Sequence, residues 1–274
     1  METQENQENQ ENQEKDILSL IESSIKKGNE NIESFNTKLL SNIKKIDKLQ
    51  NIKNIVEKNL SEKNIYFIRH AESEHNVLEQ KYSFYEFDKW NIHDPKLTEK
   101  GIEQTNSYTK EKLKKNKIHF DSVFVSPLTR TIQTYFLIEK DLNDDAKIIV
   151  TDFLKEVVSS GLDKNKGKKL SQLKEEYKNT KLNFEFMTKE YWWYNHGQDK
   201  GKEESEGNKS FSIRLSIFIL WMAFRKEKNI LIISHSHVFI NMQDSEGIYN
   251  GDMVKMDSKA LFKKIIGLFK YYID

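Results

Sequence analysis

The sequence predicts an α/β protein, with a three-layer, mostly parallel sheet covered by helices on both faces and a helical extension in front of it. After residue 60, short apolar segments alternate with amphipathic ones, which is typical of parallel strands joined by helices. Before residue 60, apolar residues recur at steps of three and four without any strand pattern. The 274 residues suffice for a substantial core, and 11% aromatic residues favour a folded chain.

The N-terminal region divides into a polar tail and a helical part. Residues 1–16 repeat the triplet ENQ, which offers nothing to bury, so we expect a disordered tail. Residues 17–60 are expected to be helical, with a break at Gly28-Asn29 and an amphipathic helix over 35–56. The apolar stripe of that helix needs a partner surface. We favour its own domain over a coiled-coil dimer, which leaves a homo-oligomer open.

Residues 61–274 form the predicted α/β domain. The expected strands are 64–68, 121–125, 147–150, 229–234 and an edge strand near 253–256. The expected helices are 97–115 with Thr98 as its N-cap, 128–139, 170–177, 211–225 and 259–271. Residues 178–210 show little periodicity and are expected to form an insertion over one end of the sheet.

Composition narrows the functional classes. With 44 basic and 43 acidic residues the net charge is +1, so we expect neither nucleic acid nor an anionic membrane as a partner. Cysteine is absent, which removes thiol chemistry and fits a reducing compartment. The start resembles no signal or transit peptide, and the most apolar stretch, 215–224, is far shorter than the roughly 20 residues of a membrane span. We expect a cytoplasmic protein.

Polar residues that could take part in catalysis or ligand binding stand where predicted strands end. One strand ends on Arg69-His70, another ends on His235, and a third runs into a turn that contains Arg130. Adjacent parallel strands would bring these ends to the same carboxyl edge of the sheet. Two imidazoles and two guanidinium groups would repel each other there unless an anion joined them, and guanidinium suits phosphate oxygens. The pattern therefore predicts an oxyanion site.

Other chemistries lack their motifs. His70 and His75 are five residues apart, whereas a zinc protease helix needs HExxH. No GxGxxG or GxxxxGK[ST] occurs, and neither Ser73 nor Ser126 lies in a GxSxG elbow. We therefore predict no metal and no cofactor.

Five motifs in this order resemble the histidine phosphatase superfamily, the phosphoglycerate-mutase-like fold. They are RHAES with Asn76, LTEKG at 97–101 with Gln104, SPLTRT at 126–131 with Gln133-Thr134, LKE at 154–156 and ISH at 233–235. The resemblance covers roughly residues 62 to 256. Residues 1–60 lie outside it.

The resemblance implies phosphoryl transfer through a phosphohistidine, without a metal. His70 would attack phosphorus, while Arg69, Arg130 and His235 would hold the phosphoryl oxygens. Glu156 matches the usual proton donor of the family. The physics agrees, since a carboxyl next to an anionic phosphate has a raised pKa and keeps its proton. The expected substrate-binding residues are Arg69, Ser73, Asn76, Arg130, His235 and Ser236.

The chain also departs from the family pattern. Ala71 replaces a common Gly, Lys155 stands where Arg is frequent, and Ser236-His237 replaces a Gly after the second histidine. His237 is interpreted equally well as a pocket-wall or a structural residue. Trp192-Trp193-Tyr194 could form an aromatic lid, although we favour an anchor of the insertion to the core.

The same site can serve a phosphatase or a mutase (an isomerase). Region 157–210 lacks the proline-containing basic segment of glycolytic phosphoglycerate mutases and looks more like the phosphatase-like branch. The sequence therefore favours hydrolysis of a phosphomonoester, in a small molecule or a phosphoprotein. A phosphoglycerate mutase is the alternative. A fold-retaining binding or scaffold protein with little turnover is a second one, against which the intact set of catalytic residues argues.

Overall fold

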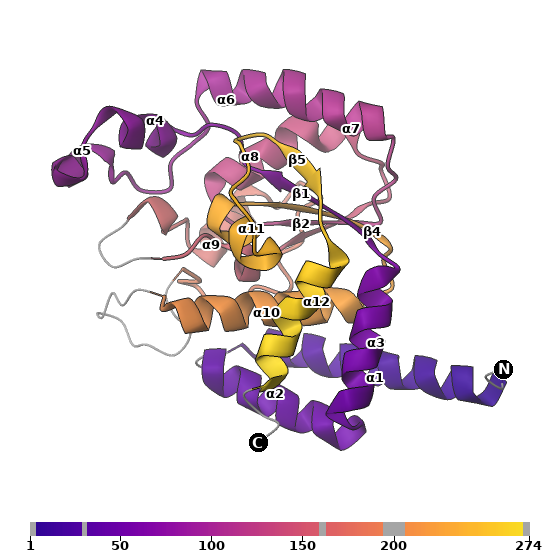
Figure 1. Cartoon of the computed structure of the whole chain (residues 1–274). Coiled ribbons are helices and arrows are strands. Elements are labelled where there is room, and N and C mark those ends of the chain that lie inside the picture. The colour runs from indigo at the N-terminus through magenta and orange to yellow at the C-terminus, as the bar shows by residue number, and fades with distance from the viewer. Residues whose placement is uncertain (1–3, 29–31, 159–162, 194–205, 271–274) are drawn as a thin grey trace.

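A computed structural model describes residues 4–28, 32–158, 163–193 and 206–270. At its centre lies a five-stranded sheet in the order β3-β2-β4-β1-β5 (Figure 1). Its strands are β1 (Asn64–Arg69), β2 (Ser122–Val125), β3 (Lys147–Val150), β4 (Asn229–Ser234) and β5 (Met253–Lys255). All neighbours pair in parallel except β5, which runs antiparallel to β1 at the edge. The predicted fold class is confirmed.

The strand register aligns the ends of three strands. Arg69 of β1 pairs with Ser234 of β4, and Val125 of β2 pairs with Ile233 of β4. β4 is thus the central strand between β1 and β2, and the residues that follow all three strands lie at one carboxyl edge. Four consecutive residues of β2 and five of β4 are buried, as expected for a sheet covered on both faces.

One face of the sheet carries the helices that follow β1 and β2. They are α6 (Glu99–Gln104), the π-helical turn η2 (Thr105–Thr109), α7 (Lys110–Asn116) and α8 (Thr129–Ile138). In place of the single helix expected over 97–115, three elements follow one another: α6, η2 and α7. The Thr98 hydroxyl caps α6, as expected, by accepting from the Gly101 amide. Val123, Val125, Leu231 and Ile233 pack on this side with residues of α8 and of α9 (Leu170–Glu176).

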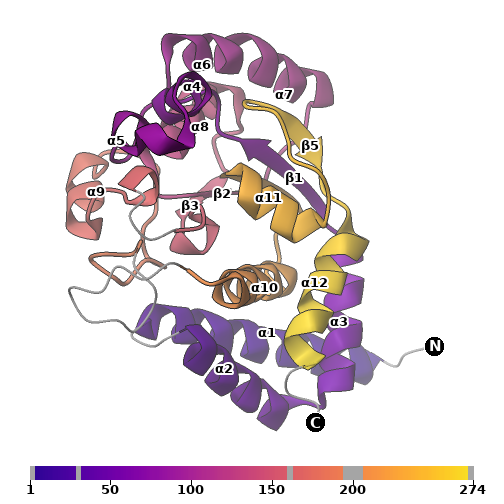
Figure 2. The same ribbon diagram turned by 60° about the vertical axis from the view of Figure 1, so that its left-hand side comes forward.

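The opposite face is covered by α10 (Asn208–Phe224), α11 (Ser236–Gln243) and α12 (Ser258–Lys270). α10 is buried nearly all round, which explains its apolar sequence. The sheet lies on one side of it and three N-terminal helices on the other (Figure 2). These are α1 (Gln4–Lys27), α2 (Ile32–Ile46) and α3 (Leu49–Ser61). They add a layer to the fold beyond α10.

The expectation of a disordered tail is wrong for residues 4–16. α1 begins at Gln4 and includes the ENQ repeats, and only residues 1–3 of the tail lie outside the described ones. Glu and Gln are good helix formers, and the repeat continues a helix whose Ile17 and Ile21 are fully buried. The Asn59 amide of α3 also donates to Glu14 over 3.0 Å. Residues 4–16 are helical because the rest of α1 is packed into the core through Ile17 and Ile21.

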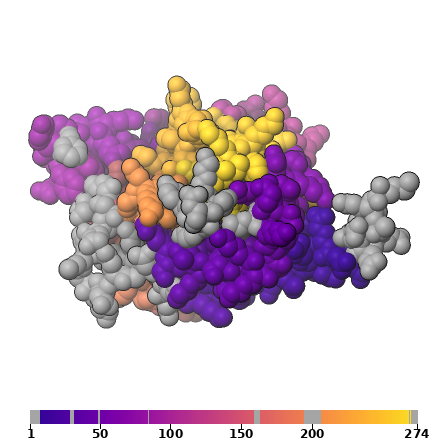
Figure 3. All heavy atoms as spheres, turned by 60° about the horizontal axis from the view of Figure 1, so that its bottom comes forward, coloured from indigo at the N-terminus to yellow at the C-terminus, as the bar shows by residue number. Residues whose placement is uncertain are grey.

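The apolar stripe over 35–56 belongs to two helices, not one. The chain turns between α2 and α3, where the Asp47 carboxylate accepts from the Lys48 amide (2.6 Å) and from the Asn51 side chain (3.0 Å). Both helices contact α10, and α3 also contacts α12. Figure 3 shows the N-terminal helices (indigo to purple) beside α12 (yellow) on one face of the molecule. The favoured interpretation, packing on its own domain, is confirmed.

The remaining short elements had no counterpart in the sequence pattern. They are α4 (Glu74–Lys81), η1 (Phe84–Glu86), α5 (Phe87–Trp90), η3 (Glu139–Asp141), η4 (Asp152–Leu154) and η5 (Asp163–Asn165). Within the described ranges, no helix is both long and apolar enough to cross a bilayer.

The described part of the 178–210 insertion is tied to the sheet at its edge. Asn183 bridges Ile149 of β3, so this part runs alongside the edge strand. Trp192 and Trp193 are buried in the core next to α9. They therefore anchor the insertion, as we favoured, whereas Tyr194 lies outside the described residues.

The packing of α3 yields a stability prediction. Ile52 is fully buried, so Ile52→Ala should lower the free energy of unfolding by about 2–5 kcal/mol. Glu57→Ala on the exposed side of the same helix should change it by less than about 0.5 kcal/mol. Urea unfolding of both variants measures the difference. Equal stability of the two would show that the N-terminal helices are a passive attachment.

Candidate active site

Two histidines meet at the carboxyl edge of the central strands. His70 follows β1 and donates its backbone amide to the carbonyl of Ser234 over 2.9 Å. His235 follows β4, and the two imidazole rings lie 5.1 Å apart between centroids. Both side chains are almost completely buried. The strand register thus brings together the two histidines as the sequence predicted.

The surroundings of His70 define which ring nitrogen is free to react. Its Nδ1 lies 2.8 Å from the Ala71 carbonyl oxygen. Because a carbonyl can only accept, Nδ1 carries the proton and Nε2 has the lone pair. Arg130 donates from Nε to this Nε2 over 3.2 Å. The lone pair of His70 therefore faces a guanidinium group.

Arg130 is held at the start of α8 by the loop after β3. Its two terminal nitrogens donate to the Lys164 carbonyl (2.9 Å) and to the Asn165 side chain (3.0 Å). Burial lowers its pKa to about 10, which leaves it cationic at neutral pH. The side chain is thus a fixed, buried positive charge beside His70.

Two buried side-chain nitrogens at this edge have no partner in the described part of the chain: Nδ1 of His235 and Nε of Arg69. The other ring nitrogen of His235 lies 2.8 Å from the Ser126 hydroxyl, while Arg69 donates a terminal nitrogen to the Ile248 carbonyl over 2.7 Å. A buried polar group without a partner costs free energy. An anion with several acceptor oxygens would accept from Arg69 Nε, and also from His235 Nδ1 in the tautomer in which the Ser126 hydroxyl donates to Nε2.

Burial keeps the histidines neutral. Desolvation, followed by the charges of Arg130 and Arg69, holds the pKa of His70 well below its ordinary value. The pKa of His235 is lowered well below its ordinary value by burial and by Arg130. A neutral imidazole is the nucleophilic form, so His70 is ready to attack at neutral pH.

The loop after β1 is ordered by hydrogen bonds among polar side chains. Ser73 is the N-cap of α4, and its hydroxyl donates to the Asn76 Oδ1 over 2.9 Å. Asn250 donates to the same Oδ1 (3.2 Å) and to the His70 carbonyl (3.1 Å). His75 is buried and contacts Ser73 over 2.8 Å. This network positions the segment that follows the nucleophile candidate.

The motif residues without obvious chemistry support the same loop. Gln104 accepts from the Glu72 amide over 3.0 Å, and Gln133 accepts from the Leu97 amide over 2.8 Å. A Cβ at Gly101 would lie 2.0 Å from the Glu72 carbonyl oxygen, so only glycine fits there. These motifs therefore shape the backbone around His70.

Glu156 lies at the edge of the cluster and contacts His237. Its Oε2 is 3.2 Å from the His237 Nδ1, and its Oε1 accepts from the Val157 amide over 2.8 Å. Burial alone would raise the pKa of Glu156, but the hydrogen bond and charge of His237, with Arg130, lower it below its ordinary value. The same contact raises the pKa of His237. The contact thus favours the pair of a charged Glu156 carboxylate and a protonated His237.

A buried ion pair holds the segment that carries Glu156. Arg214 of α10 binds Glu206 through two hydrogen bonds of 2.7 and 2.6 Å, and both side chains are at most 2% exposed. Arg214 also donates to the carbonyls of Phe153 (2.5 Å) and Lys155 (3.1 Å). The Ser234 hydroxyl donates to the Leu154 carbonyl over 2.7 Å. The backbone before Glu156 is therefore fixed to α10 and to β4.

The structure brings five predicted residues together: His70, Arg69, Arg130, His235 and Glu156. Ser73 and Asn76 lie next to them in the loop network. Ser236 begins α11 directly after His235, but its hydroxyl makes no hydrogen bond to the described site residues. That Ser73, Asn76 and Ser236 bind substrate stays a prediction.

Sequence reasoning missed the supporting residues. Asn250 and Asn165 belong to none of the motifs and to none of the expected helices or strands. Arg214 and Glu206 are eight residues apart at the start of an apolar helix, and charged residues at such positions could have indicated a buried pair. Ser126 stood within a motif but gave no sign of its contact with His235.

The ion pair yields a testable prediction. Glu206→Gln leaves the Arg214 charge buried without compensation and should lower the free energy of unfolding by about 3–5 kcal/mol. The double variant Glu206→Gln/Arg214→Met should lose less than the sum of the two single variants. Asp244→Asn, which breaks an exposed pair with Lys263, serves as control and should cost at most about 1 kcal/mol. Additive effects in urea unfolding would contradict the buried pair.

Comparisons with known proteins place this arrangement in a family. The model of the histidine phosphatase superfamily (branch 1) matches residues 65–242, which include all five clustered residues. A search of curated proteins found no match.

Several solved structures are similar to the chain. A candidate α-ribazole-5′-phosphate phosphatase from Escherichia coli is 22% identical, with 73% of this chain and 84% of that chain covered and a TM-score of 0.42. Ecdysone phosphate phosphatase from the silkworm is 13% identical, with 72% of this chain and 90% of that chain covered and a TM-score of 0.49. Phosphoserine phosphatase from Entamoeba histolytica is 19% identical, with 73% of this chain and 99% of that chain covered and a TM-score of 0.41.

The family model covers more than half of the 274 residues and spans the nucleophile candidate, both arginines and the second histidine. The chain therefore belongs to the histidine phosphatase superfamily, branch 1.

Proposed function

We propose that the chain is a metal-independent phosphatase that hydrolyses a phosphomonoester through a phosphohistidine at Nε2 of His70. In the first step Nε2 attacks phosphorus, the ester P–O bond breaks, and the departing alkoxide takes a proton from Glu156. In the second step water attacks phosphorus, the P–N bond breaks, and the Glu156 carboxylate accepts the proton of the water. Inorganic phosphate leaves.

The observation that carries this proposal is the tautomer of His70. The Ala71 carbonyl holds the proton on Nδ1, and the free Nε2 faces the Arg130 guanidinium. A phosphoryl group that displaces this contact would have its phosphorus near Nε2 and its oxygens near Arg130. The unpartnered Nε–H of Arg69, and His235 with its proton on Nδ1, would then bind the remaining oxygens, where negative charge is stabilised in the transition state.

The protonation of Glu156 requires the substrate. In the site without phosphate the pKa of Glu156 is lowered, first of all by the hydrogen bond from His237 against the opposing effect of burial. A phosphate dianion brings negative charge beside the carboxylate and raises its pKa. His237, 3.2 Å away, can supply the proton that Glu156 then passes to the leaving group.

The experiment that tests this function is a metal-free phosphatase assay of the wild type and His70→Ala. With EDTA present, a panel of sugar phosphates, phosphoglycerates and phosphopeptides should include at least one substrate. His70→Ala should lower kcat/KM at least about 10³-fold, because no other residue replaces the nucleophile. The control His119→Ala, at a side chain that is 60% exposed, should retain activity. Wild-type activity in His70→Ala would contradict the mechanism.

The same assay distinguishes the alternatives. A mutase would interconvert phosphoglycerates faster than it releases phosphate, because the phosphohistidine passes its phosphoryl group to a second hydroxyl acid. A binding or scaffold protein would turn over no substrate, although the phosphate oxygens would still bind. Activity that disappears with EDTA and returns with one divalent ion would contradict metal independence.

Replacement of Glu156 should affect substrates according to their leaving groups. An alkyl alkoxide needs a proton in the transition state, whereas nitrophenolate barely does, and general acid catalysis contributes about 10²–10⁴-fold. Glu156→Gln should therefore lose most activity on an alkyl phosphate but keep most of the phosphoenzyme burst with nitrophenyl phosphate. The burst phase is measured because the later attack by water is slowed in both cases. Equal loss of the burst for both substrates would place the acid elsewhere, with Asp152 as the nearest rival.

A further inference from the structure

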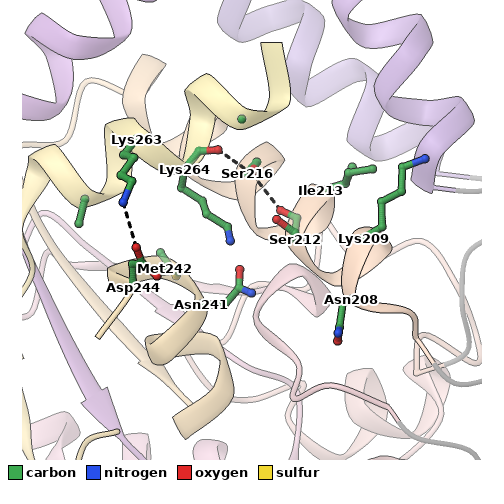
Figure 4. Close-up of a pocket in the computed structure, with 12 residues that line it drawn as sticks. Asn208, Lys209, Ser212, Ile213, Ser216, Asn241, Met242, Asp244, Lys263 and Lys264 are labelled. Carbon is green, nitrogen blue, oxygen red and sulfur yellow. Dashed lines mark hydrogen bonds and ion pairs between the residues drawn. The ribbon is translucent and has the colours of Figure 1, made fainter. Parts of the chain in front are cut away.

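A cavity lies among the helices on one face of the sheet, away from the catalytic residues. It is formed by α10, α11 and α12, has a volume of about 450 Å³, and is shown in Figure 4. None of the five clustered catalytic residues lines it. Its size is in the range of cavities that bind small molecules.

One lysine of this cavity makes no direct ion pair, although the Asp244 carboxylate in the same lining acts on it electrostatically. Three lysines line it, and two of them have partners: Lys263 pairs with Asp244 and Lys209 with Glu33, each at 3.0 Å. The Nζ of Lys264 makes no hydrogen bond or ion pair with any residue in the described ranges. In Figure 4 its side chain extends from α12 into the space between the helices. Burial also lowers the pKa of this amine.

An acceptor without a partner faces the same space. The Oδ1 of Asn241 is buried and has no hydrogen-bond partner among the described residues. Asn241 lines the cavity from α11. A buried oxygen of this kind costs free energy unless a donor reaches it, so a ligand that brings a hydroxyl or amino group would be favoured.

The rest of the lining is partly apolar. Ile213, Met242, Ala260 and Gly267 contribute carbon surface. One unpaired cation matches a single negative charge better than a phosphate dianion, and the apolar wall suits a hydrocarbon group. The three features together specify the ligand class.

We infer that this cavity binds a small organic monocarboxylate that carries an apolar group and a hydroxyl or amino donor. The carboxylate pairs with Lys264, the donor reaches Asn241, and the apolar group packs on Ile213 and Met242. The ligand would contact α11, the helix whose first turn carries His237 beside Glu156. The inference is independent of the reaction catalysed at His70.

Gly267 offers a way to close the cavity without disturbing the fold. It lines the cavity, and a Cβ added at this helical position would meet nothing within 4 Å. Gly267→Leu should therefore fill part of the space. Gly267→Ala is the matched control, since it adds one methyl group and favours the helix.

The test is isothermal titration calorimetry of the full chain with phenyllactate, which has a carboxylate, a hydroxyl and a phenyl ring. Phenyllactate should bind at millimolar or lower concentration, and the neutral 3-phenylpropane-1,2-diol should bind at least about tenfold more weakly. Lys264→Met should weaken phenyllactate about tenfold, and Gly267→Leu should abolish its binding. Lys259→Met, at an exposed position of α12 outside the cavity, and Gly267→Ala should bind as the wild type does.

Binding should also persist in His70→Ala, which separates this cavity from the catalytic edge. The inference is overturned if phenyllactate gives no heat of binding, or if it binds Lys264→Met and Gly267→Leu as tightly as the wild type. It is equally overturned if binding is lost in His70→Ala, because phenyllactate would then occupy the catalytic site. Thermal unfolding of every variant shows whether a loss of binding reflects a loss of folding.

Discussion

The parallel pairing of β1 with β4 is the constraint on which the catalytic edge depends. Because Arg69 pairs with Ser234, the next residue of each strand is a histidine, and both rings emerge at the same level of the sheet. A slip of one residue would turn every side chain of a strand to the opposite face. The register is secured by apolar residues on both faces, with Phe67 and Ile232 toward α10 and Leu231 and Ile233 toward α8. The packing of the core thereby fixes the distance between the two histidines.

The register also concentrates positive charge in a buried place. Arg130 has its guanidinium fully inside the protein, and Arg69 leaves a buried nitrogen without a partner. His70 and His235 are neutral in this environment, since burial and the arginines lower their pKa values. The site is thus arranged for an incoming anion and not for the empty state. Hydrogen bonds to Lys164 and Asn165 hold Arg130 in place, so little reorganisation is needed when the phosphate arrives.

Much of this could be predicted from the sequence, because strand ends and motif order report the sheet edge directly. The predicted strands at 147–150 and 229–234 have the observed bounds, and His70, His235 and Arg130 meet as expected. The helicity of residues 4–16 could not be predicted, because it depends on the burial of Ile17 and Ile21 against helices far along the chain. The same holds for the hydrogen bonds of Arg214 to the carbonyls of Phe153 and Lys155, which belong to a distant segment. Such contacts leave no periodic signal in the sequence.

His237 has a physical consequence for Glu156, the proposed proton donor. Without the His237 side chain, the buried Glu156 carboxylate would keep the backbone amides of Val157 and His237 as its hydrogen-bond partners. Here the imidazole hydrogen-bonds the carboxylate, lowers the pKa of Glu156 and raises its own. The carboxylate is therefore charged before substrate arrives, which suits the proposed second step, in which Glu156 would accept a proton from water. His237, whose side chain is 66% exposed, connects Glu156 to solvent and in the proposed mechanism returns the proton needed for the first step. An exposed histidine thus couples the charge of Glu156 to the pH of the solution.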